Sequence, residues 1–225
     1  MSFKQISFKT PLSALALALV TSTAMAGSLF SQAPIDGGDG GFSNVSAGAQ
    51  NADGFTLSNA ASITDLRWWG SYDTVDTDSF LIRILSNSAG SPGAIKQSYT
   101  TTAPGAATSL TDIAGAVVYQ YDFHLPSALA LTAGNYYLSV SNETTTASWY
   151  WLFGGGGDSK SWNRAADGDP WALAASDFAI LIEGEISSVP GAVPEPETLA
   201  LLAIGWVAMG AGRAARKRRS GRSAT

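Results

Sequence analysis

The stretch SFLIRIL, residues 79–85, decides the fold class of this chain. Phe80, Ile82 and Ile84 share one side of an extended backbone and Arg83 points to the other, because successive side chains of a β-strand alternate between two faces. An α-helix would place its apolar residues three or four positions apart. The stretch therefore predicts a β-strand with one buried face.

The same alternation recurs between residues 55 and 186. It is clear in segments 118–123, 136–140 and 178–186, and further strands are expected at 61–69, 94–101 and 147–153. Turn-forming sequences such as Ser91-Pro92-Gly93 separate the segments, whereas residues 27–52, rich in Gly, Ser and Asn, suggest a loose lead-in. About eight or nine strands and no convincing amphipathic helix predict an all-β domain, a jelly-roll-like antiparallel β-sandwich.

Composition limits the chemistry that this domain can perform. The 225 residues include no cysteine and one histidine, His124. Disulfides, thiolate nucleophiles, cysteine-ligated metals and multi-histidine metal sites are therefore excluded. His124 is expected to be a surface residue at a strand end, since no Gly-x-Ser-x-Gly nucleophile elbow accompanies it. We expect no catalytic residue, no metal site and no cofactor.

Charge is strongly segregated along the chain. Residues 27–193 contain 16 acidic and 5 basic side chains, a net charge of 5 − 16 = −11. Such a domain repels phosphate backbones, so nucleic acid is not expected as a partner. The remaining basic residues all lie at the two ends of the chain, which have the composition of sorting segments.

The N-terminal end has the layout of a secretion signal. Lys4 and Lys9 precede a mainly apolar run at residues 12–20, and Ala24-Met25-Ala26 forms a small-x-small cleavage site. We expect the secretion machinery to cut between Ala26 and Gly27, which makes residues 1–26 a signal peptide. An uncleaved anchor is the alternative, although the apolar run is short for a span of roughly 20 residues.

The C-terminal end combines three parts in order. Prolines at 194 and 196 keep the segment Pro194-Glu195-Pro196 extended. Fourteen apolar residues follow at 199–212 and predict a single transmembrane helix in the inner membrane. The basic residues behind it should stay cytoplasmic and stop translocation: Arg213, Arg216, Lys217, Arg218 and Arg219.

This layout resembles the PEP-CTERM sorting signal of Gram-negative bacteria. The resemblance covers residues 193–219 and implies processing by exosortase, a transpeptidase-like membrane enzyme, and a link to exopolysaccharide and biofilm. A plain C-terminal anchor would show the same helix and charges without the Pro-Glu-Pro motif. A GPI signal would end in its apolar tail, whereas this chain ends in basic residues. We therefore divide the chain into the signal peptide 1–26, a β-sandwich ectodomain 27–188 and a sorting region 189–219.

Tryptophans are the candidate ligand-binding residues of the ectodomain. Sugar rings stack on exposed aromatic faces, and Trp162 and Trp171 lie in polar, loop-like sequence, so they are the candidates for glycan binding. Trp149 and Trp151 share one strand face and fill the core if that face points inward. Two acidic runs, Asp73/Asp76/Asp78 and Asp167/Asp169, lack the EF-hand pattern and suggest solvated turns more than a calcium site.

The sequence thus predicts an exported, non-enzymatic protein of the cell surface or extracellular matrix. It would be anchored in the inner membrane before exosortase acts and would be associated with exopolysaccharide or biofilm afterwards. Two alternatives remain: a secreted hydrolase acting on polysaccharide, and a carbohydrate-binding module with calcium. A hydrolase requires two carboxyl groups facing each other across a cleft, one of them with a raised pKa.

Overall fold

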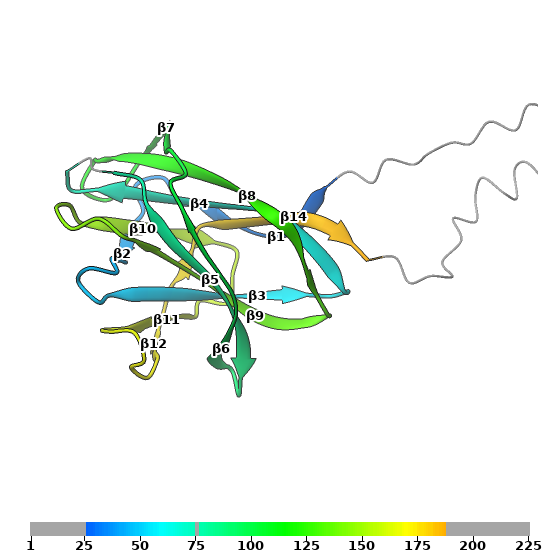
Figure 1. Ribbon diagram of the computed structural model, residues 1–225. Coiled ribbons are helices and arrows are strands. Elements are labelled where there is room, and N and C mark those ends of the chain that lie inside the picture. The colour runs from blue at the N-terminus through cyan, green and yellow to red at the C-terminus, as the bar shows by residue number, and fades with distance from the viewer. Residues whose placement is uncertain (1–25, 75–76, 188–225) are drawn as a thin grey trace, which may run out of the picture.

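The computed structural model describes residues 26–74 and 77–187, which form two antiparallel β-sheets packed face to face (Figure 1). The described strands, in chain order, are β1 (Gly27–Pro34), β2 (Gly40–Phe42), β3 (Gln50–Leu57), β4 (Ala61–Tyr72), β5 (Phe80–Ser88), β6 (Ser91–Thr101), β7 (Ala106–Thr111), β8 (Val117–Leu131), β9 (Gly134–Asn142), β10 (Trp149–Gly155), β11 (Ser161–Arg164), β12 (Ala172–Ala174), β13 (Asp177–Phe178) and β14 (Ile180–Ile186). The predicted all-β, antiparallel architecture is confirmed.

The strands of each sheet do not follow their order along the chain. The eight-stranded sheet runs β13-β10-β1-β14-β4-β8-β7, with β2 paired to β10, and the six-stranded sheet runs β12-β11-β3-β9-β5-β6. Within these sheets, β1-β14-β4-β8 faces β3-β9-β5-β6, and the chain crosses repeatedly from one layer to the other. Such crossings place strands that are distant in the sequence side by side.

The alternating pattern of residues 79–85 decides which face of β5 is buried. Phe80, Ile82 and Ile84 are fully buried between the sheets, whereas Arg83 lies on the outer face. Phe80 contacts Trp149 edge-on, with ring centroids 5.1 Å apart. Full burial of each such side chain stabilises the folded protein by about 1.5–3 kcal/mol, so this strand helps to hold the two layers together.

Strand β10 contributes the largest core side chains. Trp149 and Trp151 are fully buried, and Trp151 stacks on Phe178 with ring centroids 4.5 Å apart. Gly70 on the neighbouring β4 makes room for them, since a Cβ atom there would lie 2.4 Å from the Trp149 ring. Tyr150 points to the opposite face and contacts Phe42. The inward-facing interpretation of the two tryptophans is confirmed.

Two local predictions were wrong. Residues 27–52 are not a loose lead-in, since β1, β2 and the start of β3 lie there. Neighbouring strands supply the backbone hydrogen-bond partners of these segments, and a glycine-rich sequence gives no local sign of that pairing. The turn before β6 is formed by Ala89 and Gly90, which adopt φ angles of 51° and 85°, and not by Ser91-Pro92-Gly93, which begins β6.

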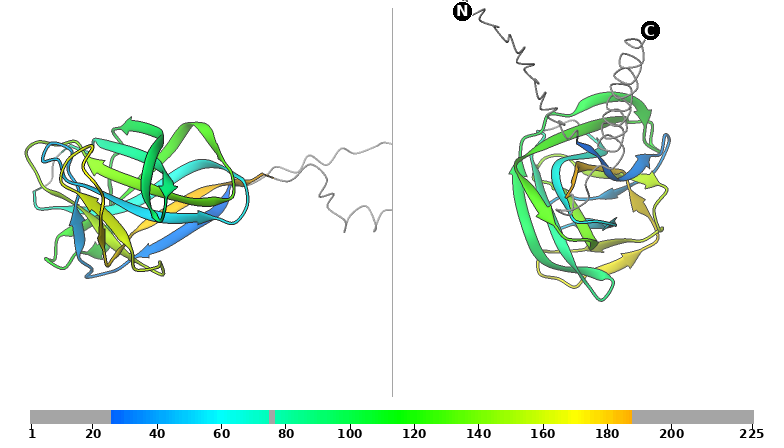
Figure 2. Two further views of the ribbon diagram at one scale, coloured as in Figure 1. Left: turned by 90° about the horizontal axis from the view of Figure 1, so that it is seen from below. Right: turned by 90° about the vertical axis from the view of Figure 1, so that its right-hand side faces the viewer.

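The described domain begins and ends at the same end of the sandwich. Gly27 on β1 pairs with Gly184 on β14, and the views in Figure 2 place the start of β1 and the end of β14 together. Within residues 26–74 and 77–187 there is no helix long and apolar enough to cross a membrane. The helix expected at residues 199–212 lies outside this part of the chain.

Candidate functional site

A cavity of about 440 Å³ lies on one flank of the sandwich, beside β3. It forms because β11 pairs with only Gln50–Asp53 of β3, so the rest of β3, beyond Asp53, is flanked in the described residues by β9 alone. Aromatic and polar side chains share its lining, chiefly Phe30, Tyr136, Tyr137, Trp162, Asn87, Asn135, Asp158 and Lys160. Aromatic surfaces with a few placed polar groups are typical of small-ligand sites.

Trp162 lines this cavity, but its predicted setting in a loop was wrong. It belongs to β11, where it is half-buried on the outer face of the six-stranded sheet. Its ring meets that of Tyr137 edge-on, with centroids 6.4 Å apart, and it packs against Ala52 and Leu85. Part of the indole therefore supports a small outer cluster, and part faces the cavity.

Trp171 is not among the cavity-lining residues. It packs against the same outer cluster as Trp162, and its ring lies 4.4 Å from the guanidinium carbon of Arg164. The two candidate tryptophans therefore lie near one patch of the sheet but in different roles. Trp162 faces the cavity, and Trp171 covers an arginine.

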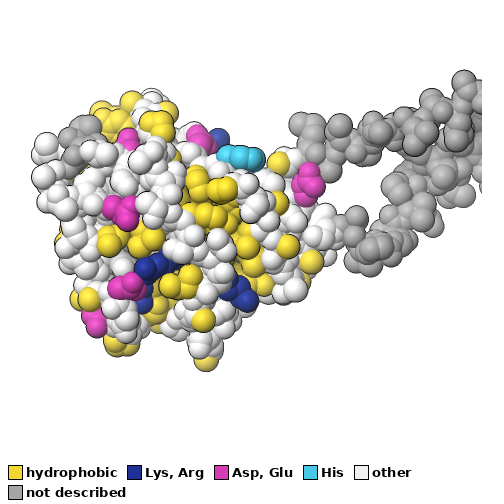
Figure 3. All heavy atoms as spheres, in the orientation of Figure 1, with side chains coloured by type: hydrophobic (Ala, Val, Ile, Leu, Met, Phe, Trp, Pro, Cys, Tyr) yellow, Lys and Arg dark blue, Asp and Glu magenta, His cyan; other side chains and the backbone are white. Residues whose placement is uncertain are grey.

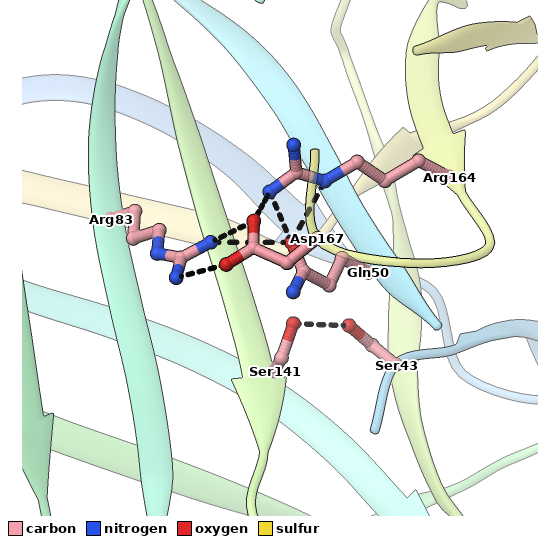
Figure 4. Close-up of polar contacts among 6 residues, drawn as sticks. All are labelled: Ser43, Gln50, Arg83, Ser141, Arg164 and Asp167. Carbon is pink, nitrogen blue, oxygen red and sulfur yellow. Dashed lines mark hydrogen bonds and ion pairs between the residues drawn. The ribbon is translucent and has the colours of Figure 1, made fainter. Parts of the chain in front are cut away.

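An arginine cluster on the outer face of the six-stranded sheet was not anticipated from the sequence (Figure 4). Arg83 on β5 donates two hydrogen bonds to the Asp167 carboxylate, at 2.9 and 2.8 Å. Arg164 on β11 donates to the same carboxylate and to Gln50 Oε1, the latter at 2.9 Å through Nε. Strand pairing brings these residues together: Gln50 is opposite Arg164 on β3. The one feature of the sequence that could have drawn attention to these arginines is the scarcity of basic residues in 27–193.

A buried carboxyl lies next to the cavity lining. Asp53 is fully buried, and desolvation raises its pKa to about 8. Its oxygens accept hydrogen bonds from the amides of Gly54, at 2.6 Å, and Phe178, at 2.5 Å. The Gln32 amide nitrogen, oriented to satisfy its neighbours, also donates to Asp53, at 2.8 Å. With both oxygens engaged inside the protein, Asp53 acts as a structural link between the sheets.

Asp177 fixes the loop at the rim of the cavity. Its carboxylate accepts the amides of Ser159 and Lys160, at 3.1 and 3.3 Å. Gly157 packs directly on this group, since a Cβ atom there would lie 2.4 Å from the Asp177 carboxyl carbon. The loop that carries Asp158 and Lys160 is therefore held in a defined position.

The two acidic runs serve as turns and ion-pair partners in the structure. Asp73 accepts the amides of Thr74 and Ser148, at 2.6 and 2.8 Å, whereas Asp167 is paired with the arginines. Asp76 lies outside the described residues. Within the described ranges, no group of three or more His, Asp or Glu side chains is placed to hold a metal ion. His124 is exposed and contacts Asp65, at 2.8 Å.

A second cavity, of about 490 Å³, lies among the loops at the end of the sandwich away from Gly27 and Ile186. Its lining includes Asp39, Asp73, Asp112, Tyr72 and Tyr150. Asp112 is engaged by the protein itself, because it accepts the amides of Ala114 and Ala116, at 2.9 and 2.8 Å, and the Ser71 hydroxyl, at 2.7 Å. These internal bonds identify Asp112 as a residue that shapes its turn.

The predicted sorting residues lie mostly outside the described residues. Ala26 is exposed and immediately precedes β1, so a cut before Gly27 would release the sandwich at the start of its first strand. Ala24, the Pro194-Glu195-Pro196 motif and the basic cluster fall in the parts that the structure does not describe.

Comparison with known proteins bears on the sorting region. A family model of the PEP-CTERM protein-sorting motif matches residues 192–219, which confirms the resemblance of the C-terminal segment. Comparison of the chain with curated proteins gives no match.

Proposed function

We propose that this chain, which carries a PEP-CTERM protein-sorting motif, is an exported surface or matrix protein whose sandwich domain binds exopolysaccharide without cleaving it. The observation that carries the proposal is the motif at residues 192–219. The motif implies export, membrane anchoring before cleavage and processing by exosortase. Retention in the exopolysaccharide matrix of a biofilm is the further step that we propose.

The placement of the chain ends supports this route. Ile186, the last residue of β14, is separated from the start of the matched motif by residues 187–191, a connection of at most about 18 Å when extended. The end of the sandwich that holds Gly27 and Ile186 would therefore face the membrane before processing. The cavity beside β3 is on a flank, where this orientation leaves it open to the surroundings.

The lining of the flank cavity supports glycan binding. Sugar rings present apolar C–H faces and polar hydroxyl edges, and this cavity offers aromatic rings together with the amides of Asn87 and Asn135. Asp158 is the single carboxylate among its lining residues in the described ranges. A facing pair of carboxyls is needed for glycoside hydrolysis. The cavity therefore favours binding over cleavage, in keeping with a non-enzymatic role.

Two measurements test the proposal. Deleting the exosortase gene in the native host should leave a longer form of the protein in the inner membrane, detected by immunoblotting of fractions. For glycan binding, full-length protein is co-sedimented with matrix polysaccharide, and Trp162→Ala should weaken binding by roughly fivefold or more. The matched control is Tyr150→Ala, an aromatic truncation in the second cavity, which should bind normally. Equal binding by both variants and the wild type would refute the flank-cavity assignment.

A further inference from the structure

Basic residues gather around the flank cavity although the domain is strongly acidic. Residues 27–193 contain five of them, and three belong to this flank: Lys160 lines the cavity, and Arg83 and Arg164 lie on the outer face of the six-stranded sheet, where Trp162 also lies. Figure 3 shows dark-blue side chains set among hydrophobic ones on the face in view. Carboxylates accompany these cations, since Asp158 lies 3.9 Å from Lys160 and Asp167 pairs with both arginines, so an anionic ligand would take the place of one of these carboxylates.

Strand register sets the arginines in line with the cavity aromatic. Trp162, Ala52, Ser139 and Arg83 lie opposite one another on four adjacent strands. Three strand spacings separate the first from the last, roughly 14 Å between backbones. Ala52 and Ser139 between them are small and buried, and Trp171 packs on the cluster that contains Ala52. A short saccharide segment lying across the strands would reach from the indole to the guanidinium once the Trp171 side chain moves aside.

The two guanidiniums are held for carboxylate recognition. The Arg83 and Arg164 side chains are 13% and 9% exposed, whereas the Asp167 side chain that pairs with both is 57% exposed. Bidentate contact with a planar carboxylate is the geometry that arginine favours. One carboxylate is thus shared by two nearly buried cations, with Asp169 a more distant negative charge near Arg164. Arg83 Nε is also buried without a hydrogen-bond partner among the described residues.

The carboxylate that occupies the pair comes from an exposed loop. Asp167 lies in the connection between β11 and β12, next to Gly168, whose φ of +93° marks a tight turn. Trp171, at the end of the same connection, covers Arg164. Because the Asp167 side chain is exposed, a ligand carboxylate can approach from solvent and compete with it for the arginines.

We propose that Arg83 and Arg164 bind a carboxylate of an acidic, uronate-bearing polysaccharide, and that Asp167 occupies the pair until such a ligand displaces it. The inference rests on the proposed glycan-binding function and specifies its ligand class. Trp162 takes the sugar ring, the arginines take the carboxylate, and Lys160 adds positive charge at the rim. Neutral polysaccharides gain the first contact only.

The test compares binding of polygalacturonate and of dextran, an uncharged polymer, to the full-length protein. Asp167→Asn weakens the internal competitor, so polygalacturonate should bind about three- to tenfold more tightly while dextran binding is unchanged. Asp169→Asn is the matched control, because it removes the same charge from the same loop but its side chain makes no hydrogen bond or ion pair with either arginine, and it should leave both affinities near the wild-type values.

A second variant keeps the test decisive if Asp167→Asn fails to fold. Arg83→Gln keeps a polar side chain but removes the bidentate donor, and it should weaken polygalacturonate binding about tenfold while sparing dextran. Wild-type affinity of Arg83→Gln for polygalacturonate, or equal gains in Asp167→Asn and Asp169→Asn, would overturn the proposal. If Trp162→Ala weakens binding of both polymers but the Asp167 and Arg83 variants bind both as the wild type does, the proposed glycan binding is supported and the proposed selectivity for acidic polysaccharide is refuted. If neither polymer binds the wild type, both proposals fall.

Discussion

Gly27 and Gly184 lie directly opposite each other on β1 and β14, so the first and last strands of the sandwich meet at one end. A chain that is cut before Gly27 and held through its C-terminal tail would therefore be tethered through a single end. The loops at the far end and the flank beside β3 would then face away from the tether. Both terminal sorting events can act on this domain without disturbing its sheets.

Reversing the charge of the basic tail should disturb anchoring. Substitution of Arg216, Lys217, Arg218 and Arg219 by Glu removes the positive charge that we expect to keep this end in the cytoplasm. We expect reduced membrane retention or inverted orientation, measured by protease protection in spheroplasts. The control replaces each Arg of the four by Lys and the Lys by Arg, which keeps the charge, and it should behave as the wild type. Unchanged topology of the charge-reversed protein would argue against a stop-transfer role.

Trp151→Ala should strongly destabilise the sandwich. Its indole is fully buried, stacks on Phe178 and donates a hydrogen bond to the Ala179 carbonyl, at 3.1 Å. Truncation of a large core aromatic costs about 3–5 kcal/mol. The loss should appear as a lower urea midpoint of full-length protein, followed by tryptophan fluorescence and far-ultraviolet circular dichroism. Tyr150→Ala, one residue away on the opposite face, should cost much less; similar losses would mean that the alternation of β10 is misassigned.

Stability should fall as pH rises through the neutral range. Burial raises the pKa of Asp53 to about 8, from about 4 in an unfolded chain, and the charges of Asp177 and Asp158 act in the same direction. The folded state therefore binds this proton more tightly. Its stabilisation is complete below about pH 4 and is lost as pH rises toward about 8, with a slope of at most roughly 1.4 kcal/mol per pH unit.

Thermal melts of wild type and Asp53→Asn between pH 4 and 9 check this expectation. The variant cannot titrate at residue 53, so its melting temperature should vary less with pH in this window. Asp158→Asn, at an exposed position, controls for the loss of one negative charge. Parallel pH curves for the wild type and Asp53→Asn would show that Asp53 does not hold its proton in the folded state.

Local alternation was sufficient to predict most of the core strands, although β3, which buries Phe55 and Leu57, was missed. In β5, β8 and β9 every second residue is apolar, and a half-buried strand imposes that spacing directly on the sequence. The same logic oriented Trp149 and Trp151. It failed at β1 and β2, where short glycine-containing segments are held by distant partners such as β14 and β10. Such pairing depends on strands more than a hundred residues away, which no local pattern records.

The candidate site, like the fold, was only partly predictable from the sequence. Trp162 could be selected from composition, because large aromatic residues in polar surroundings are natural ligand contacts. The arginine cluster could not, since Arg83, Arg164 and Asp167 are brought together only by the order of β5, β9, β3 and β11. Likewise, Asp53 is an ordinary carboxylate in the sequence and becomes a buried link only through its contact with Phe178.

The final prediction concerns the sorting motif itself. Replacing Pro194, Glu195 and Pro196 together by Ala should block exosortase processing while export and membrane insertion continue. We expect export to depend on the first 26 residues, which are untouched, and insertion to depend on the apolar segment 199–212, which the substitutions leave intact. Recognition by a membrane enzyme should require an extended segment at the membrane surface, since proline stiffens it and peptide-binding sites commonly take extended chains.

Alanines at these positions would let the anchor helix extend backward through the motif, because Ala is the best helix former and Pro the worst. The unprocessed form should then accumulate in the inner membrane with its sandwich outside. Pulse-chase labelling with immunoblotting of membrane fractions measures the rate and size of maturation. Glu195→Gln, which keeps both prolines, is the matched control for backbone stiffness and should mature faster than the triple variant. If the triple-Ala protein matured at the normal rate to the normal size, the tail would act as a plain anchor, and processing through the Pro-Glu-Pro segment would have to be abandoned.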